Sequence, residues 1–132
     1  MARILIVDDD LAVSETFARM LRLDGHEVST FETAAGALED AERRVPDALI
    51  LDMRLSGAGG LDFLRNLRAN ARFQTVPVGV VTGDYFLKDE VLAELGALGA
   101  TVRYKPMWMA DLSALAETLL DPSRPRTSAG EI

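Results

Sequence analysis

The sequence contains no cysteine and a single histidine, His26. Disulfides, thiolate nucleophiles and cysteine-based zinc sites are therefore excluded, and an H-E-x-x-H zinc site lacks its second histidine. No apolar run reaches the roughly 18 residues of a membrane-spanning helix, and the first residues lack the pattern of a secretion signal. These absences predict a cytoplasmic protein that does not associate with a membrane.

Positive charge is scarce, and lysine most of all. The 132-residue chain has 14 Lys and Arg against 21 Asp and Glu, which gives a formal net charge of -7. This balance argues against direct binding of nucleic acid, because phosphate backbones are bound by clustered Lys and Arg. Lys88 and Lys105 are the only lysines. A lysine directly after a strand is therefore hard to explain as background surface charge.

The length and composition predict one globular domain. Hydrophobic residues make up 48% of the chain and charged residues 27%, which is ordinary for such a domain. The end of the chain is rich in Pro and Ser and has no apolar spacing, which is typical of a linker. We expect residues 1–120 to form the domain and residues 121–132 a flexible tail or linker.

Short apolar runs alternate with helix-length segments along the chain. The runs are nearly continuous, which favours strands buried on both faces, as in a parallel sheet. The predicted strands are residues 4–7, 27–31, 48–51, 76–81 and 101–104. The predicted helices are residues 11–23, 33–44, 61–69, 88–98 and 110–120. Five βα units predict an α/β fold: a doubly wound, five-stranded parallel sheet in three α/β/α layers, flavodoxin-like.

Local signals mark several helix ends. Asp10 and Thr33 stand where a side chain could cap the helix that follows. Gly25 stands where the first helix should stop.

Polar residues follow four of the five predicted strands. Asp8 and Asp9 follow the first strand, Asp52 the third, Thr82 the fourth and Lys105 the fifth. Ligands of open parallel sheets bind outside the carboxyl ends of the strands, where the strand order reverses. We therefore expect these side chains to converge at one edge of the sheet.

Such a group favours phosphoryl chemistry. Carboxylates within about 4 Å repel by about 4 kcal/mol per pair at an effective dielectric near 20, so a proton or a cation is expected between them. Oxygen ligands favour Mg²⁺ or Mn²⁺. The Lys105 ammonium and the Thr82 hydroxyl would suit a transferring phosphoryl group, and a carboxylate can itself be the nucleophile.

With these motifs the chain resembles the receiver domains of two-component response regulators, the CheY-like domains, over roughly residues 2–120. Each motif is weak alone, but four of them in this order and spacing form a strong signal. The motifs are Ile-Leu-Ile-Val-Asp-Asp at 4–9, Leu-Ile-Leu-Asp-Met-Arg-Leu-Ser at 49–56 followed by Gly60, Val-Val-Thr-Gly at 80–83, and Tyr-Lys-Pro at 104–106.

The resemblance implies a phosphoacceptor and a metal site. Asp52 would accept the phosphoryl group as an aspartyl phosphate. Asp9, Asp52 and the backbone carbonyl of Met53 would bind Mg²⁺ directly, and Asp8 would act mainly through metal-bound water.

The resemblance also implies roles around the phosphoryl group. Thr82 would hydrogen-bond to it and Lys105 would pair with it. Pro106 would follow a cis peptide bond, which costs little for an X-Pro bond.

Several positions depart from the family pattern or vary within it. Receivers usually carry proline where Ser56 stands, which suggests a more flexible loop there. Val102 occupies the position of the family's aromatic switch residue, and the aromatic here is Tyr104, which strand alternation puts on the same face. We hypothesise that Arg54 and Asp84 pair at the rim of the site and slow the access of water to the aspartyl phosphate.

The resemblance implies a phosphoacceptor of a two-component phosphorelay. A sensor histidine kinase or phosphotransfer protein would supply the phosphoryl group to Asp52. The phosphorylated domain would change a surface that binds a downstream protein or a fused output domain. Self-phosphorylation and slow autodephosphorylation would be its only reactions, and a homodimer stays open.

Two alternatives stay open. The first is a receiver-like protein-binding module that works independently of phosphorylation, which the departure at Val102 motivates. The second is a phosphatase or phosphotransferase with an aspartate nucleophile. Arg54 argues against it, because such enzymes usually carry a D-x-D pair, and the chain has no space for a cap domain.

Overall fold

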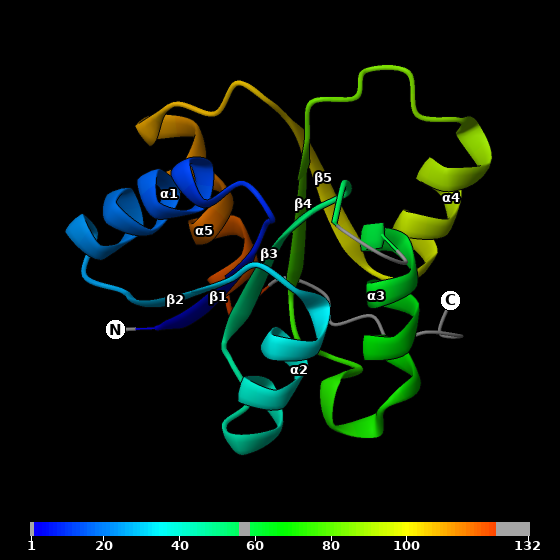
Figure 1. The fold of residues 1–132 in the computed structure, drawn as a ribbon, viewed down its shortest axis with the longest axis horizontal. Coiled ribbons are helices and arrows are strands. Elements are labelled where there is room, and N and C mark those ends of the chain that lie inside the picture. Colours follow the sequence, from blue (N-terminus) through cyan, green and yellow to red (C-terminus); the bar gives the residue numbers. More distant parts are fainter. Residues whose placement is uncertain (1, 56–58, 124–132) are drawn as a thin grey trace.

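The computed structural model describes residues 2–55 and 59–123, in which strands and helices alternate along the chain (Figure 1). The strands are β1 (Arg3–Val7), β2 (Glu27–Phe31), β3 (Ala48–Asp52), β4 (Val78–Thr82) and β5 (Ala100–Tyr104). The helices are α1 (Leu11–Leu23), α2 (Ala34–Arg43), α3 (Gly59–Ala69), α4 (Asp89–Ala97) and α5 (Met109–Leu120), and the short 3-10 helix η1 (Ala71–Phe73) follows α3.

The strands form one parallel sheet in the order β2-β1-β3-β4-β5. Helices α1 and α5 cover one face, and α2, α3 and α4 cover the other (Figure 1). The chain turns back between β1 and β3, because β2 lies on one side of β1 and β3 on the other. The predicted doubly wound, three-layer fold is confirmed, and β1 and β3 flank its switch point.

Both faces of the central strands are buried, which explains their continuous apolar runs. Along β1, Leu5 and Val7 face the core beneath α2 and α3, whereas Ile4 and Ile6 face the core beneath α1 and α5. All four side chains are at most 1% exposed. The sheet is thus held by apolar contacts on both sides, and its carboxyl edge is left to polar residues.

Strand β4 begins two residues later than the sequence predicts. The N–H of Val76 donates to Phe73 in the turn that follows η1, and the Pro77 carbonyl accepts from the N–H of Leu49. Residue 76 therefore belongs to the connection and not to the strand.

Gly79 weakens the apolar run of β4 in the sequence, but the packing explains it. A Cβ atom there would lie 3.1 Å from Leu119 and 3.2 Å from Leu115. The missing side chain lets α5 pack directly on the strand.

The three residues predicted to mark helix ends are confirmed in that role. The Asp10 carboxylate accepts the N–H of Val13 at the start of α1, and the Thr33 hydroxyl accepts the N–H of Gly36 at the start of α2. Gly25 follows α1 with a φ of +94°, a conformation that favours glycine.

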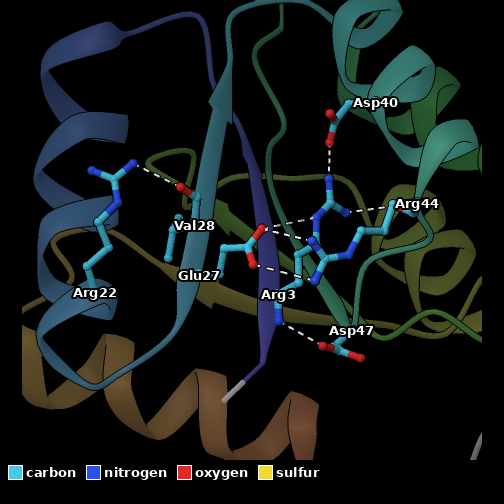
Figure 2. Close-up of polar contacts among 7 residues, drawn as sticks. All are labelled: Arg3, Arg22, Glu27, Val28, Asp40, Arg44 and Asp47. Atoms are coloured by element: carbon cyan, nitrogen blue, oxygen red, sulfur yellow. Dashed lines mark hydrogen bonds and ion pairs between the residues drawn. The ribbon is translucent and has the colours of Figure 1, made fainter.

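A polar network around Arg3 ties together the amino ends of β1, β2 and β3 (Figure 2). Arg3 is only 6% exposed, and its guanidinium pairs with Asp40 and Glu27 and donates to the Arg44 carbonyl. Its backbone N–H donates to the Asp47 carboxylate at 2.7 Å. One buried arginine therefore links β1 to β2, to α2 and to the segment before β3.

Candidate functional site

Three carboxylates gather at the carboxyl edge of the sheet. Asp8 and Asp9 follow β1 and Asp52 ends β3, and these strands are neighbours in which Val7 pairs with Leu51. One oxygen atom from each carboxylate lies within 4.8 Å of the others. Asp8 and Asp52 are buried and Asp9 is exposed. The structure therefore brings this acidic trio together, as the strand pattern predicts.

Backbone donors and one lysine orient the buried carboxylates. Asp8 Oδ1 accepts the N–H of Asp10 at 2.9 Å, and Asp52 Oδ1 accepts the N–H of Arg54 at 3.3 Å. The Nζ atom of Lys105 lies 3.6 Å from Asp8 Oδ2 and 3.7 Å from Asp52 Oδ2. The lysine thus faces both carboxylates on their second oxygen atoms.

The electrostatics of the trio favour a cation. Burial raises the pKa of Asp8 above its ordinary value, and the nearby Asp52 carboxylate raises it further. The Asp10 N–H and the Lys105 ammonium lower the same pKa, and the balance of all these effects is a rise. The Lys105 ammonium and the Asp10 N–H therefore do not fully offset the burial of Asp8 and its repulsion with Asp52.

The donor set fits Mg²⁺, because carboxylate oxygens are hard ligands and magnesium sites use few of them. The carbonyl of Met53, which the family resemblance adds as a ligand, accepts the N–H of Gly60 at 3.0 Å. A Cβ atom on Gly60 would lie 2.7 Å from the Asp52 carbonyl oxygen and 2.9 Å from Met53 Cα. Gly60 therefore lets the start of α3 fit against the backbone that carries the acceptor.

Thr82 and Lys105 are joined across the ends of β4 and β5. Thr82 is fully buried and pairs with Tyr104 in the sheet, and its carbonyl accepts the N–H of Lys105 at 2.8 Å. Its hydroxyl oxygen accepts the N–H of Asp84 at 3.0 Å. The peptide bond before Pro106 is cis, as expected.

The position of the family's aromatic switch holds an aliphatic side chain, Val102. Val102 is partly buried and packs against the cluster beneath α3 and α4. Tyr104 is 38% exposed and stacks on Tyr85, with ring centroids 5.5 Å apart and an interplanar angle of 17°. The sequence analysis did not single out Tyr85. The available signal was two adjacent aromatic residues, Tyr85 and Phe86, in a chain with only 6% aromatic residues.

The rim residues do not meet as hypothesised. Arg54 is exposed, and among ion pairs within residues 2–55 and 59–123 none joins it to Asp84. Asp84 instead accepts the N–H of Phe86 at 2.9 Å. Ser56, where a more flexible loop was expected, lies outside the described residues.

The sequence comparisons identify the family. The model of the response regulator receiver domain matches residues 4–116. The response regulator MprA of Mycobacterium leprae is 34% identical over 98% of this chain and 56% of its own length. The transcriptional regulatory protein PrrA of the same organism is 38% identical over 89% of this chain and 49% of its own. The chain belongs to the response regulator receiver domain family.

Solved structures agree with this assignment. The Vibrio cholerae chemotaxis protein CheY4 is 26% identical, with a TM-score of 0.83 over 91% of this chain and 99% of its own. The receiver domain of NtrX from Brucella abortus is 29% identical, with a TM-score of 0.80 over 91% and 99%.

Two further facts concern the length of the chain and its helices. The chain spans about half the length of the curated relatives it matches. None of the helices within the described residues is long and apolar enough to cross a bilayer.

Proposed function

We propose that Asp52 accepts a phosphoryl group from a phosphohistidine and that the acidic trio holds a divalent cation during the transfer. The observation that carries this proposal is the arrangement around Asp52. Its carboxylate shares one site with Asp8 and Asp9, faces the Lys105 ammonium at 3.7 Å, and ends the strand beside β4, which carries Thr82.

The transfer is a displacement at phosphorus. A carboxylate oxygen of Asp52 attacks, the new O–P bond forms, and the P–N bond of the phosphohistidine breaks as the imidazole leaves with the electron pair. Lys105 donates to a phosphoryl oxygen. Because the Thr82 oxygen accepts from Asp84, its own proton is directed elsewhere and can be donated to another phosphoryl oxygen. Attack by water on the acyl phosphate resets the site.

The cation would be Mg²⁺ or Mn²⁺, held by Asp9, Asp52 and the Met53 carbonyl, with Asp8 acting through metal-bound water. When bound, it neutralises negative charge on the transferring group. Burial and, to a smaller extent, the nearby Asp52 carboxylate raise the pKa of Asp8. This rise supports the assignment, because a bound cation would stabilise the ionised carboxylate against both effects.

The donor would be a sensor histidine kinase or a phosphotransfer protein in the cytoplasm, and the output a downstream partner or a fused domain. Residues 1–120 would be the receiver and 121–132 a tail or linker. Helix α5 ends at Leu120, which supports the boundary, and residues 124–132 lie outside the described part. No finding favours a module that works without phosphorylation.

Phosphoramidate, a small donor with a P–N bond like that of phosphohistidine, tests the proposal. With Mg²⁺ we expect a covalent phosphoryl adduct that hydroxylamine removes, as it removes an acyl phosphate. Without a divalent cation, or in Asp52→Asn, we expect none. An adduct that resists hydroxylamine, or that forms equally in Asp52→Asn, would contradict the proposal.

A further inference from the structure

We propose that Tyr85 is a positioning residue for Lys105: it fixes the backbone of the lysine and thereby the place of its ammonium group. This inference rests on the proposed function and deepens it. It adds a residue that lies outside the motifs that carry the family resemblance.

The peptide groups of Lys105 are held on both sides. Its N–H donates to the Thr82 carbonyl at 2.8 Å. Its carbonyl accepts a hydrogen bond from the hydroxyl of Tyr85, twenty residues earlier in the chain. The side chain then reaches Asp8 and Asp52 from this doubly anchored backbone.

The ring of Tyr85 adds a second attachment. It stacks on Tyr104, the residue directly before Lys105, with ring centroids 5.5 Å apart. Tyr104 is the sheet partner of Thr82. Tyr85 therefore fastens the loop after β4 onto the end of β5, at the point where the two strands deliver Thr82 and Lys105 to the site.

Two hydrogen bonds within the loop hold the backbone on either side of Tyr85. The N–H of Asp84 donates to the Thr82 hydroxyl oxygen, and the N–H of Phe86 donates to the Asp84 carboxylate. Phe86 is 91% exposed, whereas Tyr85 next to it is 59% exposed and makes both contacts. The contacts to the end of β5 are therefore made by Tyr85, whereas the neighbouring Phe86 remains exposed to solvent.

The position of Lys105 matters because it supplies the positive charge of the site. In the described residues, the ion pairs to Asp8 and Asp52 both come from its Nζ atom. A preorganised charge stabilises a transferring group only where it is held in place, so a looser backbone weakens its effect.

The test compares Tyr85→Phe, which keeps the ring and removes the hydroxyl, with Phe86→Ala as the control on the same loop. The rate of phosphorylation by acetyl phosphate at saturating Mg²⁺ is measured for each. We expect Tyr85→Phe to lower this rate by about threefold to tenfold, the effect of one hydrogen bond. We expect Phe86→Ala to leave it unchanged. An unchanged rate in Tyr85→Phe would overturn the inference.

A double-mutant cycle shows whether Tyr85 acts through the lysine. The affinity for Mg²⁺ alone is measured in the wild type, Tyr85→Phe, Lys105→Met and the double variant. Because the ammonium competes with the cation for Asp8 and Asp52, we expect Tyr85→Phe to raise the affinity when Lys105 is present. We expect no effect in the Lys105→Met background. An equal effect in both backgrounds, or none in either, would contradict the inference.

The cycle also separates the two proposals. If the wild type forms no phosphoryl adduct, the proposed function fails, and the Mg²⁺ cycle still decides whether Tyr85 positions Lys105. If the wild type is phosphorylated on Asp52 and the cycle shows no coupling, only the positioning role fails.

Discussion

The Nζ atom of Lys105 lies 3.7 Å from a carboxylate oxygen of Asp52, and both residues stand at the carboxyl edge of the sheet. The same ammonium lies 3.6 Å from Asp8. In the absence of a cation the lysine therefore offsets part of the repulsion in the acidic trio. Under the proposed function, binding of a cation and a phosphoryl group would free this ammonium to pair with the phosphoryl oxygens.

Replacing Lys105 by Met removes this offset. We expect the metal-free variant to melt below the wild type, because buried carboxylates lose their cationic partner. We expect Mg²⁺ to bind more tightly and to raise the melting temperature by more than in the wild type, because the ammonium no longer competes with it. Melting curves with and without Mg²⁺ measure both effects.

Lys88→Met is the matched control, because Lys88 is the other lysine and precedes α4 with no side-chain capping bond. It should leave the Mg²⁺ effect unchanged. If Lys105→Met binds Mg²⁺ no more tightly than Lys88→Met, the lysine does not compete for the trio.

Replacing Asp52 by Asn should stabilise the metal-free protein. The change relieves repulsion with Asp8 and Asp9, and we expect a gain on the order of 1 kcal/mol in the free energy of unfolding. Urea unfolding with a chelator present measures it. Asp89→Asn, which removes the same charge from the exposed first turn of α4, should give no such gain. A less stable Asp52→Asn would count against the clustering of the carboxylates.

The raised pKa of Asp8 predicts a pH dependence. Its carboxyl holds a proton more tightly when folded, so its contribution to stability is fully present below the unfolded pKa and is lost as pH rises through the raised folded value. Without metal, Asp8→Asn should therefore be more stable than the wild type at neutral pH, with a gain that fades on acidification. The free energy of unfolding of both proteins, measured at several pH values, tests this. A stability gain that does not change with pH would contradict a raised pKa for Asp8.

A side chain on Gly60 should disturb the site through the backbone. Its Cβ would meet the Asp52 carbonyl at 2.7 Å, and backbone atoms there cannot move aside easily. We expect Gly60→Ala to destabilise the fold by about 1–3 kcal/mol and to weaken stabilisation by Mg²⁺. Gly96→Ala in α4, where a Cβ meets nothing within 4 Å, should instead stabilise by about 0.5–1 kcal/mol. Similar losses in both variants would contradict this account.

The fold and the acidic trio were predictable because both follow from local pattern. Continuous apolar runs separated by helical segments have few solutions other than a parallel sheet, and that sheet brings the residues after its strands to one edge. Asp10 and Thr33 cap their helices through side-chain bonds within three residues, so their role is readable from the chain alone.

The remaining features depend on contacts between distant residues. The Tyr85 hydroxyl donates to the carbonyl of a residue twenty positions away, and no periodic pattern in the sequence predicts such a bond. Arg54 and Asp84 both follow strand ends, but the Asp84 carboxylate accepts the backbone N–H of Phe86 in the loop after β4. Position along the sequence predicts which edge a side chain reaches, and loop geometry decides what it binds there.

Intact mass after incubation with Mg²⁺ and acetyl phosphate tests the central claim most directly, in the wild type and in Asp52→Asn. We predict one added phosphoryl group on the wild type and none on the variant. Beryllofluoride mimics the bound phosphoryl group and is not lost by hydrolysis of an acyl phosphate. A wild type that gains no mass and also fails to bind beryllofluoride would therefore contradict the account. So would an equal gain in Asp52→Asn.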